Sequence, residues 1–477
     1  MVAFGMVGAS ISGVTFVSVP GMVLHSDMTY LQTCMGFILG YFVVAFVLLP
    51  IYYRMNLTSI YTVLRSISDE AYKTGAAIFI FSKLLSTAAK FFVPCYIISM
   101  VLGTNFYITT IMFFVLIWLY TRKGGIKTLV WTDAVQTLCM LVALGLIIYN
   151  VYGALFNYQL SILNLKECLS VVAASDYSKV FEFADWHSPN NFFKCFISGI
   201  FIVVVMTGLD QDMMQKNLTC KNLREAQKDM CTYGFAFLPV NALFLVLGIM
   251  LTMLYAKQGM ALPEKPDALL SGYVLGGGEL LVAVFLIGIM STSFSTIDSS
   301  LTALTTSFCV DIMDKEQDEG LRRRVHLLMA VMLIICTMAF GLVSTSSLID
   351  TIYRIVSYTY GPLLGLFAYA LTDSPPAPLF KRGEEQQKPS LISSREGNTF
   401  PPPLLKRGAG GESFICLASP LICFALDTYV PQFTGYHFGY ELLLINGLIT
   451  YMGLIVGQRV QRFKDLWVQK FKSSKVQ

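Results

Sequence analysis

Charged side chains are scarce in this sequence. Of its 477 residues, 34 are Lys or Arg and 30 are Asp or Glu, so only 13% of the chain is charged. Soluble domains usually carry about 25%. A chain of this length therefore has too few charges to cover the surfaces of two or three soluble domains. The composition excludes an ordinary soluble enzyme, a disordered regulator and a nucleic-acid binder.

The sequence also lacks the local motifs of several functional classes. Its 11 cysteines are scattered singly, without CxxC or metal-ligand spacing, and they are interpreted as small buried apolar side chains. There is no P-loop, which argues against ATP-driven transport. The 4 histidines lie near loops or predicted helix ends, which argues against a histidine proton relay.

Long apolar segments are abundant instead, and 55% of the residues are apolar. A helix needs about 20 apolar residues to cross a bilayer, where its backbone polar groups must be paired internally. β-Barrel alternation is absent. We therefore predict an all-α polytopic protein, surrounded by the lipid bilayer, with about twelve transmembrane helices. They lie near residues 1–25, 30–53, 73–102, 105–121, 126–152, 191–214, 229–256, 277–309, 325–345, 347–371, 413–430 and 435–457.

Lys and Arg concentrate in alternate loops, and this asymmetry predicts the orientation of the chain. The rich loops contain residues 54–73, 122–127, 216–228, 315–324, 373–412 and 459–475. Because positive side chains favour the inner face, these loops are predicted to be cytoplasmic. An even number of spans then places both termini of this chain in the cytoplasm, with the protein in the inner or plasma membrane.

Four segments are predicted along the chain. Residues 1–371 form a transport core of ten helices, of which the first and sixth are broken. Residues 372–412 are a Pro-rich and charged cytoplasmic insertion, with a near-repeat at Pro376–Gly383 and Pro401–Gly408. Residues 413–460 form two peripheral transmembrane helices, and residues 461–477 are a cytoplasmic tail. We expect the insertion to be disordered and dispensable for transport, and binding of anionic lipid is the alternative.

The first apolar stretch, GMVGASISGVTFVSVPG, is poorly suited to a continuous helix because it is rich in glycine and hydroxyl residues. Unwound backbone in a membrane is stable only where it lines a cavity or is buried in protein. Secondary transporters use such broken helices to build binding sites. Close packing of helices through small residues explains this stretch of sequence equally well. Ser10 and Thr15 flank the predicted break and are expected to face a solute cavity.

A stripe of hydroxyl groups lies on the eighth predicted span. Thr292, Ser295, Thr296 and Ser299 share one helix face, with Asp298 alongside. Oxygen ligands suit a hard cation such as Na⁺. Hydroxyls that bond back to carbonyls one turn earlier are the alternative, but this alternative explains Asp298 badly. We therefore predict a Na⁺ site on this helix.

Four sequence motifs resemble those of a known protein family. They are GASISGVTFVSVPG at Gly8–Gly21, KGGIKTLVWTDAVQ at Lys123–Gln136, TGLDQDMMQKNL at Thr207–Leu218 and STIDSSLTALTTSFCVDI at Ser295–Ile312. YGPLLGLFAYAL, from Tyr360, is a weaker fifth. On these strings the sequence resembles the solute:sodium symporters, which include sodium–glucose, proline and sialic-acid carriers. The resemblance implies a LeuT-like core of two inverted five-helix repeats that works by alternating access.

The resemblance also implies a set of Na⁺ ligands. The principal site would use the backbone carbonyls of Gly8 and Ile11 in the broken first helix. The eighth helix would supply one carbonyl and two hydroxyls, which match Thr292, Ser295 and Thr296.

Some members of the family bind a second Na⁺ beneath the first. In this sequence the matching residues are Asp133, Asp298 and Ser299. An acid at position 298 departs from the hydroxyl that such members tend to have. It would either strengthen the second site or pair with another cation.

Members of the family usually begin with an extra helix before the broken one, whereas this sequence begins inside it. We therefore interpret the chain as an N-terminally truncated member. This leaves open a transport-inactive or sensor-like protein that keeps the core.

Cations within a membrane span are costly and mark function by default. Lys83 and Lys90 lie seven residues apart on roughly one face of the third span. Lys90 is a candidate for binding an acidic group of the solute, and pairing with an intramembrane acid is the alternative. Asp210 and Gln211, at the end of the sixth span, are weaker substrate candidates.

The sequence therefore predicts a Na⁺-coupled symporter, not an enzyme, that imports a small polar organic solute. A sugar, an amino acid, a carboxylate or a sialic-acid-like molecule would all suit the scaffold. The alternatives are the transport-inactive member described above and a proton-coupled transporter that uses Asp133 and Asp298.

Overall fold

The computed structural model describes residues 2–55, 57–121, 126–156, 162–342, 348–373 and 411–473. Helices form nearly all of this part of the chain, and it contains no β-strand. The all-α prediction is therefore confirmed. Of the predicted insertion at residues 372–412, the stretch 374–410 lies outside the described residues, whereas residues 372–373 end α16 and Glu412 begins α17. The α-helices are α1 (Val2–Ser10), α2 (Gly13–Ser26), α3 (Tyr30–Val43), α4 (Leu49–Met55), α5 (Asp69–Leu102), α6 (Phe106–Thr121), α7 (Ile126–Phe156), α8 (Ile162–Ala173), α9 (Phe192–Val203), α10 (Gln211–Asn217), α11 (Leu223–Lys257), α12 (Ala268–Leu275), α13 (Glu279–Ser307), α14 (Glu319–Phe340), α15 (Leu348–Thr359), α16 (Gly361–Asp373), α17 (Glu412–Thr434) and α18 (Leu442–Ser473).

Several of the long helices begin where the sequence supplies a capping side chain. The Ser68 hydroxyl accepts a hydrogen bond from the Ala71 N–H at the start of α5. The Asn222 side chain does the same for the Glu225 N–H at the start of α11. Each cap satisfies one of the N–H groups that the first helical turn leaves without a partner.

Within the described residues, eight helices are long and apolar enough to cross a membrane, or ten if two bent pairs each count as one span. The pairs are Phe192–Gly208 with Gln211–Asn217, bent by 70°, and Asp350–Thr359 with Gly361–Thr372, bent by 45°. The prediction of about twelve spans includes two more stretches, which appear as the shorter apolar helices Gly13–Ser26 and Phe106–Leu119. At about 1.5 Å per residue, helices of this length do not cross a ~30 Å hydrocarbon core alone.

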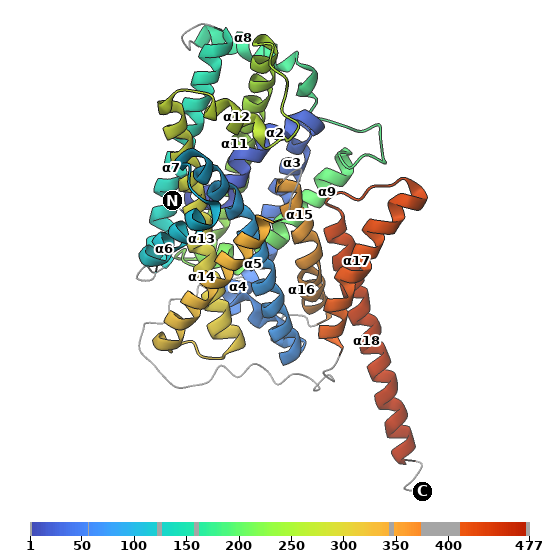
Figure 1. Cartoon of the computed structure of the whole chain (residues 1–477). Helices are drawn as coiled ribbons and strands as arrows, with labels where there is room; N and C mark the ends of the chain where they lie inside the picture. Colours follow the sequence, from blue (N-terminus) through green and yellow to red (C-terminus); the bar gives the residue numbers. More distant parts are fainter. Residues whose placement is uncertain are drawn as a thin grey trace.

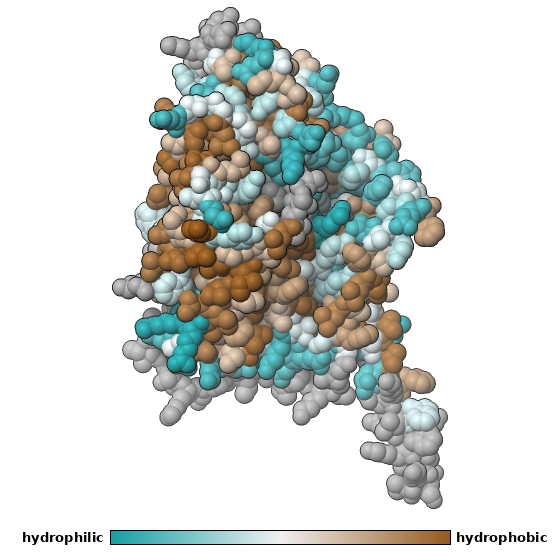
Figure 2. Space-filling model, in the orientation of Figure 1, coloured by the Kyte–Doolittle hydropathy of each residue, from teal (hydrophilic) through white to brown (hydrophobic). Residues whose placement is uncertain are grey.

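The surface has the distribution of polarity that a bilayer requires. On the face that Figure 2 shows, hydrophobic residues gather over the middle and the left of the molecule, and hydrophilic residues lie toward the top, along the right side and at the lower edge. Leu280, Phe414, Leu421 and Leu417 are 69–79% exposed. Large apolar side chains at such exposure are unfavourable in water and favourable in lipid. The described chain is therefore a multi-pass membrane protein.

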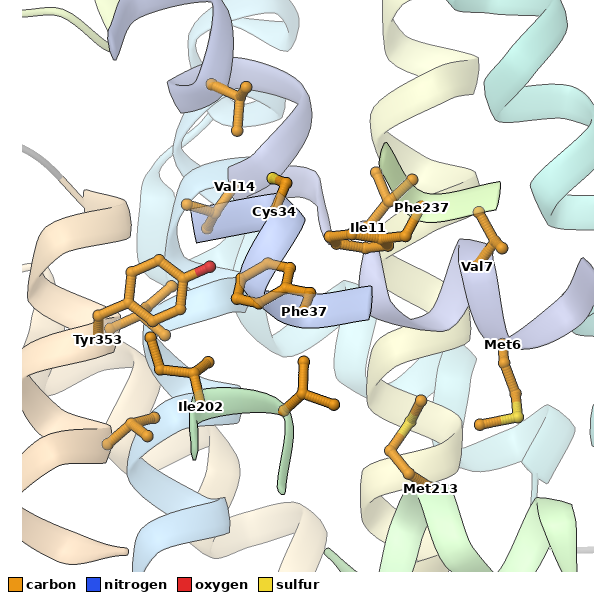
Figure 3. Packing of buried hydrophobic residues seen from close by; sticks show 14 of the residues in the cluster. Met6, Val7, Ile11, Val14, Cys34, Phe37, Ile202, Met213, Phe237 and Tyr353 are labelled. Atoms are coloured by element: carbon orange, nitrogen blue, oxygen red, sulfur yellow. The ribbon is translucent and has the colours of Figure 1, made fainter. Parts of the chain in front are cut away.

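The broken first span lies inside the helix bundle. α1 packs against α7, α11 and α13, while α2 packs against α5, α11 and α13. Figure 3 shows Met6, Val7, Ile11 and Val14, from both sides of the break, among buried apolar side chains of other helices. A Cβ atom at Gly8 would lie 2.0 Å from the Thr137 Oγ1 atom of α7. Only glycine therefore allows α1 to approach α7 so closely.

The last two helices pack on the outside of the bundle. α18 contacts α16, α15 and α17, and the Asn446 side chain donates to the carbonyls of Ser357 and Tyr358, at 2.9 Å in each case. A Cβ atom at Gly361 would lie 2.4 Å from Asn446. Figure 1 shows α18 extending beyond the other helices toward the C-terminus. The segment predicted as a tail, 461–477, is thus helical as far as Ser473.

Candidate functional site

The backbone between α1 and α2 leaves two carbonyl groups without their usual helical partners in the described part of the chain. In a continuous helix the Ser12 N–H would bond to the Gly8 carbonyl, but here it donates to the Ser10 carbonyl at 3.1 Å. The first bond of α2 runs from the Phe16 N–H to the Ser12 carbonyl, also at 3.1 Å. The Ile11 carbonyl therefore lies just outside α2. Carbonyl oxygens of this kind are suitable ligands for a hard cation.

The two threonine hydroxyls of the predicted stripe use their protons within α13. Thr296 donates to the Thr292 carbonyl at 2.9 Å, and Thr292 donates to the Ile289 carbonyl at 2.9 Å. The back-bonding alternative is therefore correct for these hydroxyls. It does not exclude a cation, because a hydroxyl that donates its proton keeps lone pairs for a further partner.

The structure brings the break and the hydroxyl helix together. A small cavity with about 140 Å³ of empty volume is lined by Ser12, Gly13, Lys90, Phe91, Ser293, Thr296 and Ile297. A Cβ atom at Gly13 would lie 2.7 Å from the Ser293 Oγ atom, so the start of α2 touches α13. The residues present therefore fit a cation bound between the two segments. Ligation of Na⁺ by Gly8, Ile11, Thr292, Ser295 and Thr296 stays a prediction.

Asp133, the carboxylate of the predicted second site, has two close partners. The Ser295 hydroxyl donates to its Oδ1 atom at 2.5 Å, and the Lys216 ammonium lies 2.8 Å from its Oδ2 atom. Asp298 and Ser299 are also buried, and the Ser299 hydroxyl donates to Asp298 at 3.4 Å. The structure thus gives Asp133 a cation from the protein itself, and Na⁺ binding at Asp133, Asp298 and Ser299 stays a prediction.

A second lysine extends this buried charge cluster. The Lys83 ammonium lies 2.9 Å from Asp210 and 2.8 Å from Asp212. Each carboxylate also accepts a hydrogen bond from a hydroxyl group. Tyr360 donates to Asp210 at 3.1 Å, and Ser300 donates to Asp212 at 3.1 Å. Lys83 is therefore an ion-paired cation, which is the alternative that the sequence left open.

Two members of the cluster, Asp212 and Lys216, were missed by sequence reasoning. Lys216 was assigned to a cytoplasmic loop, and this assignment is wrong because the residue lies in α10 and is only 1% exposed. The available signal was the i,i+4 spacing of Asp212 and Lys216, which places them on one face of a helix. A lysine within a membrane span marks a functional position by default, and this holds for Lys216 as it does for Lys83.

The predicted substrate residues have different surroundings. Lys90 is half-buried and lines the cavity beside the break. The Ser10 hydroxyl is hydrogen-bonded to the Tyr233 hydroxyl, and Thr15 lies 3.5 Å from the Ser12 hydroxyl.

The other two candidates hold protein segments together. Gln211 donates to the Thr58 carbonyl at 2.9 Å and accepts from the Ile60 N–H at 3.0 Å. Asp210 caps α10 through the Asp212 N–H at 2.9 Å, besides pairing with Lys83. Of the five predicted substrate residues, Lys90 alone is among the residues that line the cavity.

Comparison with solved structures supports the predicted fold. A Na⁺-coupled sialic acid symporter in a substrate-bound outward-open state superimposes with a TM-score of 0.74 at 16% identity, over 96% of this chain and 89% of that chain. Mhp1, a nucleobase-cation-symport-1 family transporter, gives a TM-score of 0.51 at 12% identity, over 97% and 92%. The prediction of a LeuT-like fold is confirmed.

Comparison with curated proteins finds several Na⁺-dependent transporters. The sodium/sialic acid symporter NanT of Aliivibrio fischeri is 25% identical over 383 residues, which are 76% of this chain and 73% of the relative. The human sodium/iodide cotransporter is 23% identical over 77% of this chain and 58% of the relative. The rabbit (Oryctolagus cuniculus) sodium-dependent multivitamin transporter is 22% identical over 78% and 59%. The chain thus spans less than two thirds of the last two relatives.

A sequence profile of the whole family gives the broadest match. The profile of the sodium:solute symporter family covers residues 1–372, which include the break, the α13 hydroxyls and the charge cluster. These relatives are transporters rather than enzymes. The chain therefore belongs to the sodium:solute symporter family, in which Na⁺ is the coupling ion.

Proposed function

We propose that this chain imports a small polar organic solute together with Na⁺ by alternating access. The single observation that carries the proposal is the contact between the break and α13. There the carbonyls of Gly8 and Ile11 lack helical partners, and the start of α2 borders a cavity that the Thr296 hydroxyl of α13 also lines. A hard cation suits this oxygen set because it replaces the lost hydrogen bonds of the broken helix.

Bound Na⁺ couples two structural units in this arrangement. The break belongs to the segment of α1 and α2, whereas the hydroxyls belong to α13. A cation that bridges the two favours the conformation in which they touch. A solute that prefers the same conformation must therefore raise the affinity for Na⁺. Bound Na⁺ must raise the affinity for the solute by the same factor.

The size of the cavity supports alternating access. The cavity has no room for even a water-sized sphere, whereas typical ligand pockets hold about 300 Å³ or more. An organic solute therefore needs a state in which the wall opens. The bends of 70° at residues 209–210 and 45° near Tyr360 are places where short segments move without breaking a long helix.

Lys90 narrows the class of solute to one that carries an acidic group. Lys83, on the same helix, has two carboxylates in contact, whereas Lys90 has no ion pair or hydrogen bond to the described residues and borders the cavity with Thr296. An ammonium within a membrane span needs an anionic or polar partner. A solute carboxylate would supply it, and the relatives named for sialic acid and iodide carry anions.

The adjacent charges also explain coupling. A cation at Thr296 and the ammonium of Lys90 border one cavity, so they repel each other until an anion lies between them. The anionic solute would therefore bind with Na⁺ in preference to either binding alone.

The Na⁺ site is tested by Thr296→Ala, with Thr302→Ala as the matched control. Both threonines lie on α13 and both donate to the carbonyl four residues earlier at 2.9 Å, but only Thr296 lines the cavity. Loss of one oxygen ligand should cost about 1.5 kcal/mol, which is about a tenfold rise in the Na⁺ concentration for half-maximal uptake. Equal Na⁺ dependence of the two variants would refute the site.

The solute class is tested by Lys90→Met and Lys90→Arg. Uptake of radiolabelled monocarboxylates and of neutral solutes should be measured in proteoliposomes with a Na⁺ gradient. Lys90→Met should weaken monocarboxylate transport about tenfold or more, because a charge-assisted contact is worth about 1.5–3 kcal/mol, while Lys90→Arg keeps most of it. Transport of neutral solutes only, unaffected by either change, would exclude the acidic class.

The same vesicles distinguish the other two functions that the sequence left open. A proton-coupled transporter predicts uptake driven by a pH gradient without Na⁺. The close pairing of Asp133 with Lys216 disfavours this function, because the carboxylate already has a fixed cation. A transport-inactive member predicts no uptake under either gradient.

We also propose that both termini of the chain lie in the cytoplasm of a cell whose inner or plasma membrane holds it. The distribution of Lys and Arg between loops supports this orientation. Protease accessibility of a tag at each terminus in sealed inside-out vesicles measures it. Protection of either tag would contradict the orientation.

A further inference from the structure

Lys216 lies among carboxylates from three different helices. Its ammonium is 2.8 Å from Asp133 of α7 and 3.9 Å from Asp212 of α10. The negative charge of Asp298, on α13, also acts on it. The side chains of Lys216 and Asp133 are 2% and 0% exposed. Lys216 is therefore the fixed counter-charge of an acidic cluster that water does not reach.

The local structure around the bend places Lys216 there. The polypeptide turns by 70° between Gly208 and Gln211, and Asp210 caps the new helix through the Asp212 N–H. α10 then runs only from Gln211 to Asn217, so Lys216 lies in its last turn, on the same face as Asp212. This geometry points the lysine into the bundle rather than toward a loop.

One of the two acids in contact with Lys216, Asp133, belongs to the predicted second Na⁺ site. That site consists of Asp133, Asp298 and Ser299; the Lys216 ammonium contacts Asp133 at 2.8 Å, and the charge of Asp298 also acts on it. An ammonium and a Na⁺ ion carry the same charge and both take oxygen partners. Two cations in such a small space repel each other strongly. The residues as arranged therefore do not fit an additional Na⁺ while Lys216 is in place.

We propose that Lys216 takes the place of a second Na⁺, so that this chain couples each solute to a single Na⁺. The inference rests on the proposed function, and it specifies the ion stoichiometry. A covalently attached cation satisfies the acidic cluster in every conformation and does not dissociate during the cycle. Because Ser295 donates to Asp133 at 2.5 Å, the fixed charge also holds one predicted ligand of the principal Na⁺ site in position.

The test compares the wild-type chain with Lys216→Met, Lys216→Arg and the double variant Lys216→Met/Asp133→Asn. Uptake of ²²Na⁺ and of solute in proteoliposomes gives the ratio of the two, and the Na⁺ dependence of uptake gives the Hill coefficient. The wild type and Lys216→Arg should move one Na⁺ per solute. Lys216→Met exposes the carboxylates to a free ion, so its Hill coefficient should rise toward two. The double variant should return to one.

A second measurement does not depend on transport. Thermal unfolding of the purified protein in detergent is followed with NaCl or with the chloride of N-methylglucamine, a cation too large for the site. Na⁺ should raise the midpoint of Lys216→Met more than that of the wild type, because binding to the native state stabilises it. The double variant should lose this extra stabilisation, since the Asp133 charge is gone.

Several results would overturn the inference. Two Na⁺ per solute in the wild type would do so directly, even if Lys216→Met failed to fold. An unchanged ratio in a folded Lys216→Met variant, with no extra stabilisation by Na⁺, would do so as well. Absence of any Na⁺-driven uptake by the wild type would instead count against the proposed function, and the thermal measurement would still decide whether Lys216 occupies a cation site.

Discussion

Replacing Lys83 by Met should destabilise this protein far more than the same replacement of Lys90. The two lysines lie on α5, seven residues apart, and both are within the membrane-spanning part of the helix. They differ in their partners. Lys83 contacts Asp210 at 2.9 Å and Asp212 at 2.8 Å, whereas Lys90 borders a small cavity.

The expected magnitude follows from these distances. At an effective dielectric constant of about 20, each contact of Lys83 has a Coulomb energy of about 6 kcal/mol. Most of this energy is offset by the cost of burying the charges. Removal of Lys83 alone leaves Asp210, 5% exposed, without a counter-ion and leaves Asp212, 6% exposed, with only the Lys216 ammonium at 3.9 Å. Breaking a buried pair in this way costs about 3–5 kcal/mol.

The assay is unfolding of each purified variant by denaturant at constant detergent, followed by circular dichroism. We expect Lys90→Met to stay within about 1 kcal/mol of the wild type, because no ion pair is broken and a buried charge is removed. Lys83→Met combined with Asp210→Asn should recover part of the loss, since the carboxylate that has lost its counter-ion becomes neutral. A loss below about 1 kcal/mol for Lys83→Met, or an equal loss for Lys90→Met, would refute the assignment of the buried pair.

Two further perturbations test the surroundings of the site. Gly8→Ala should abolish Na⁺-driven uptake, because its Cβ atom would lie 2.0 Å from the Thr137 Oγ1 atom and would push α1 away from α7; Gly145→Ala on α7, where a Cβ atom meets nothing within 4 Å, is the control and should behave like the wild type. Tyr360→Phe removes the hydroxyl that donates to Asp210 at 3.1 Å and should lower the free energy of unfolding by about 1–3 kcal/mol, measured as above. No change for Tyr360→Phe would mean that this hydrogen bond contributes nothing to the cluster.

Local composition was enough to predict the architecture of this protein. Apolar runs near the required length, scarce charge and the absence of strand-like alternation allow only a helical membrane protein, because unpaired backbone is too costly in lipid. Glycine and hydroxyl residues from Gly8 to Gly21 suited a break and close helix packing equally well, and the family resemblance implied the break, which the structure places at residues 11–12. Span counts were less accurate, since hydropathy does not distinguish the short α6 from a full-length span.

Pairing of the buried charges was decided by the tertiary structure alone. Spacing along the chain places Thr292 and Thr296 on one helix face, but it does not show that Ser12 and Gly13 of the break lie across from them. It likewise does not show that Lys83 finds two carboxylates while Lys90 faces a cavity, or that Lys216 turns inward to Asp133. The contacts of Lys83 and Lys216 with Asp210 and Asp133 join residues more than 80 positions apart. Helix periodicity fixes the neighbours of a residue within a few turns, whereas the partner of a buried charge depends on which helices pack together.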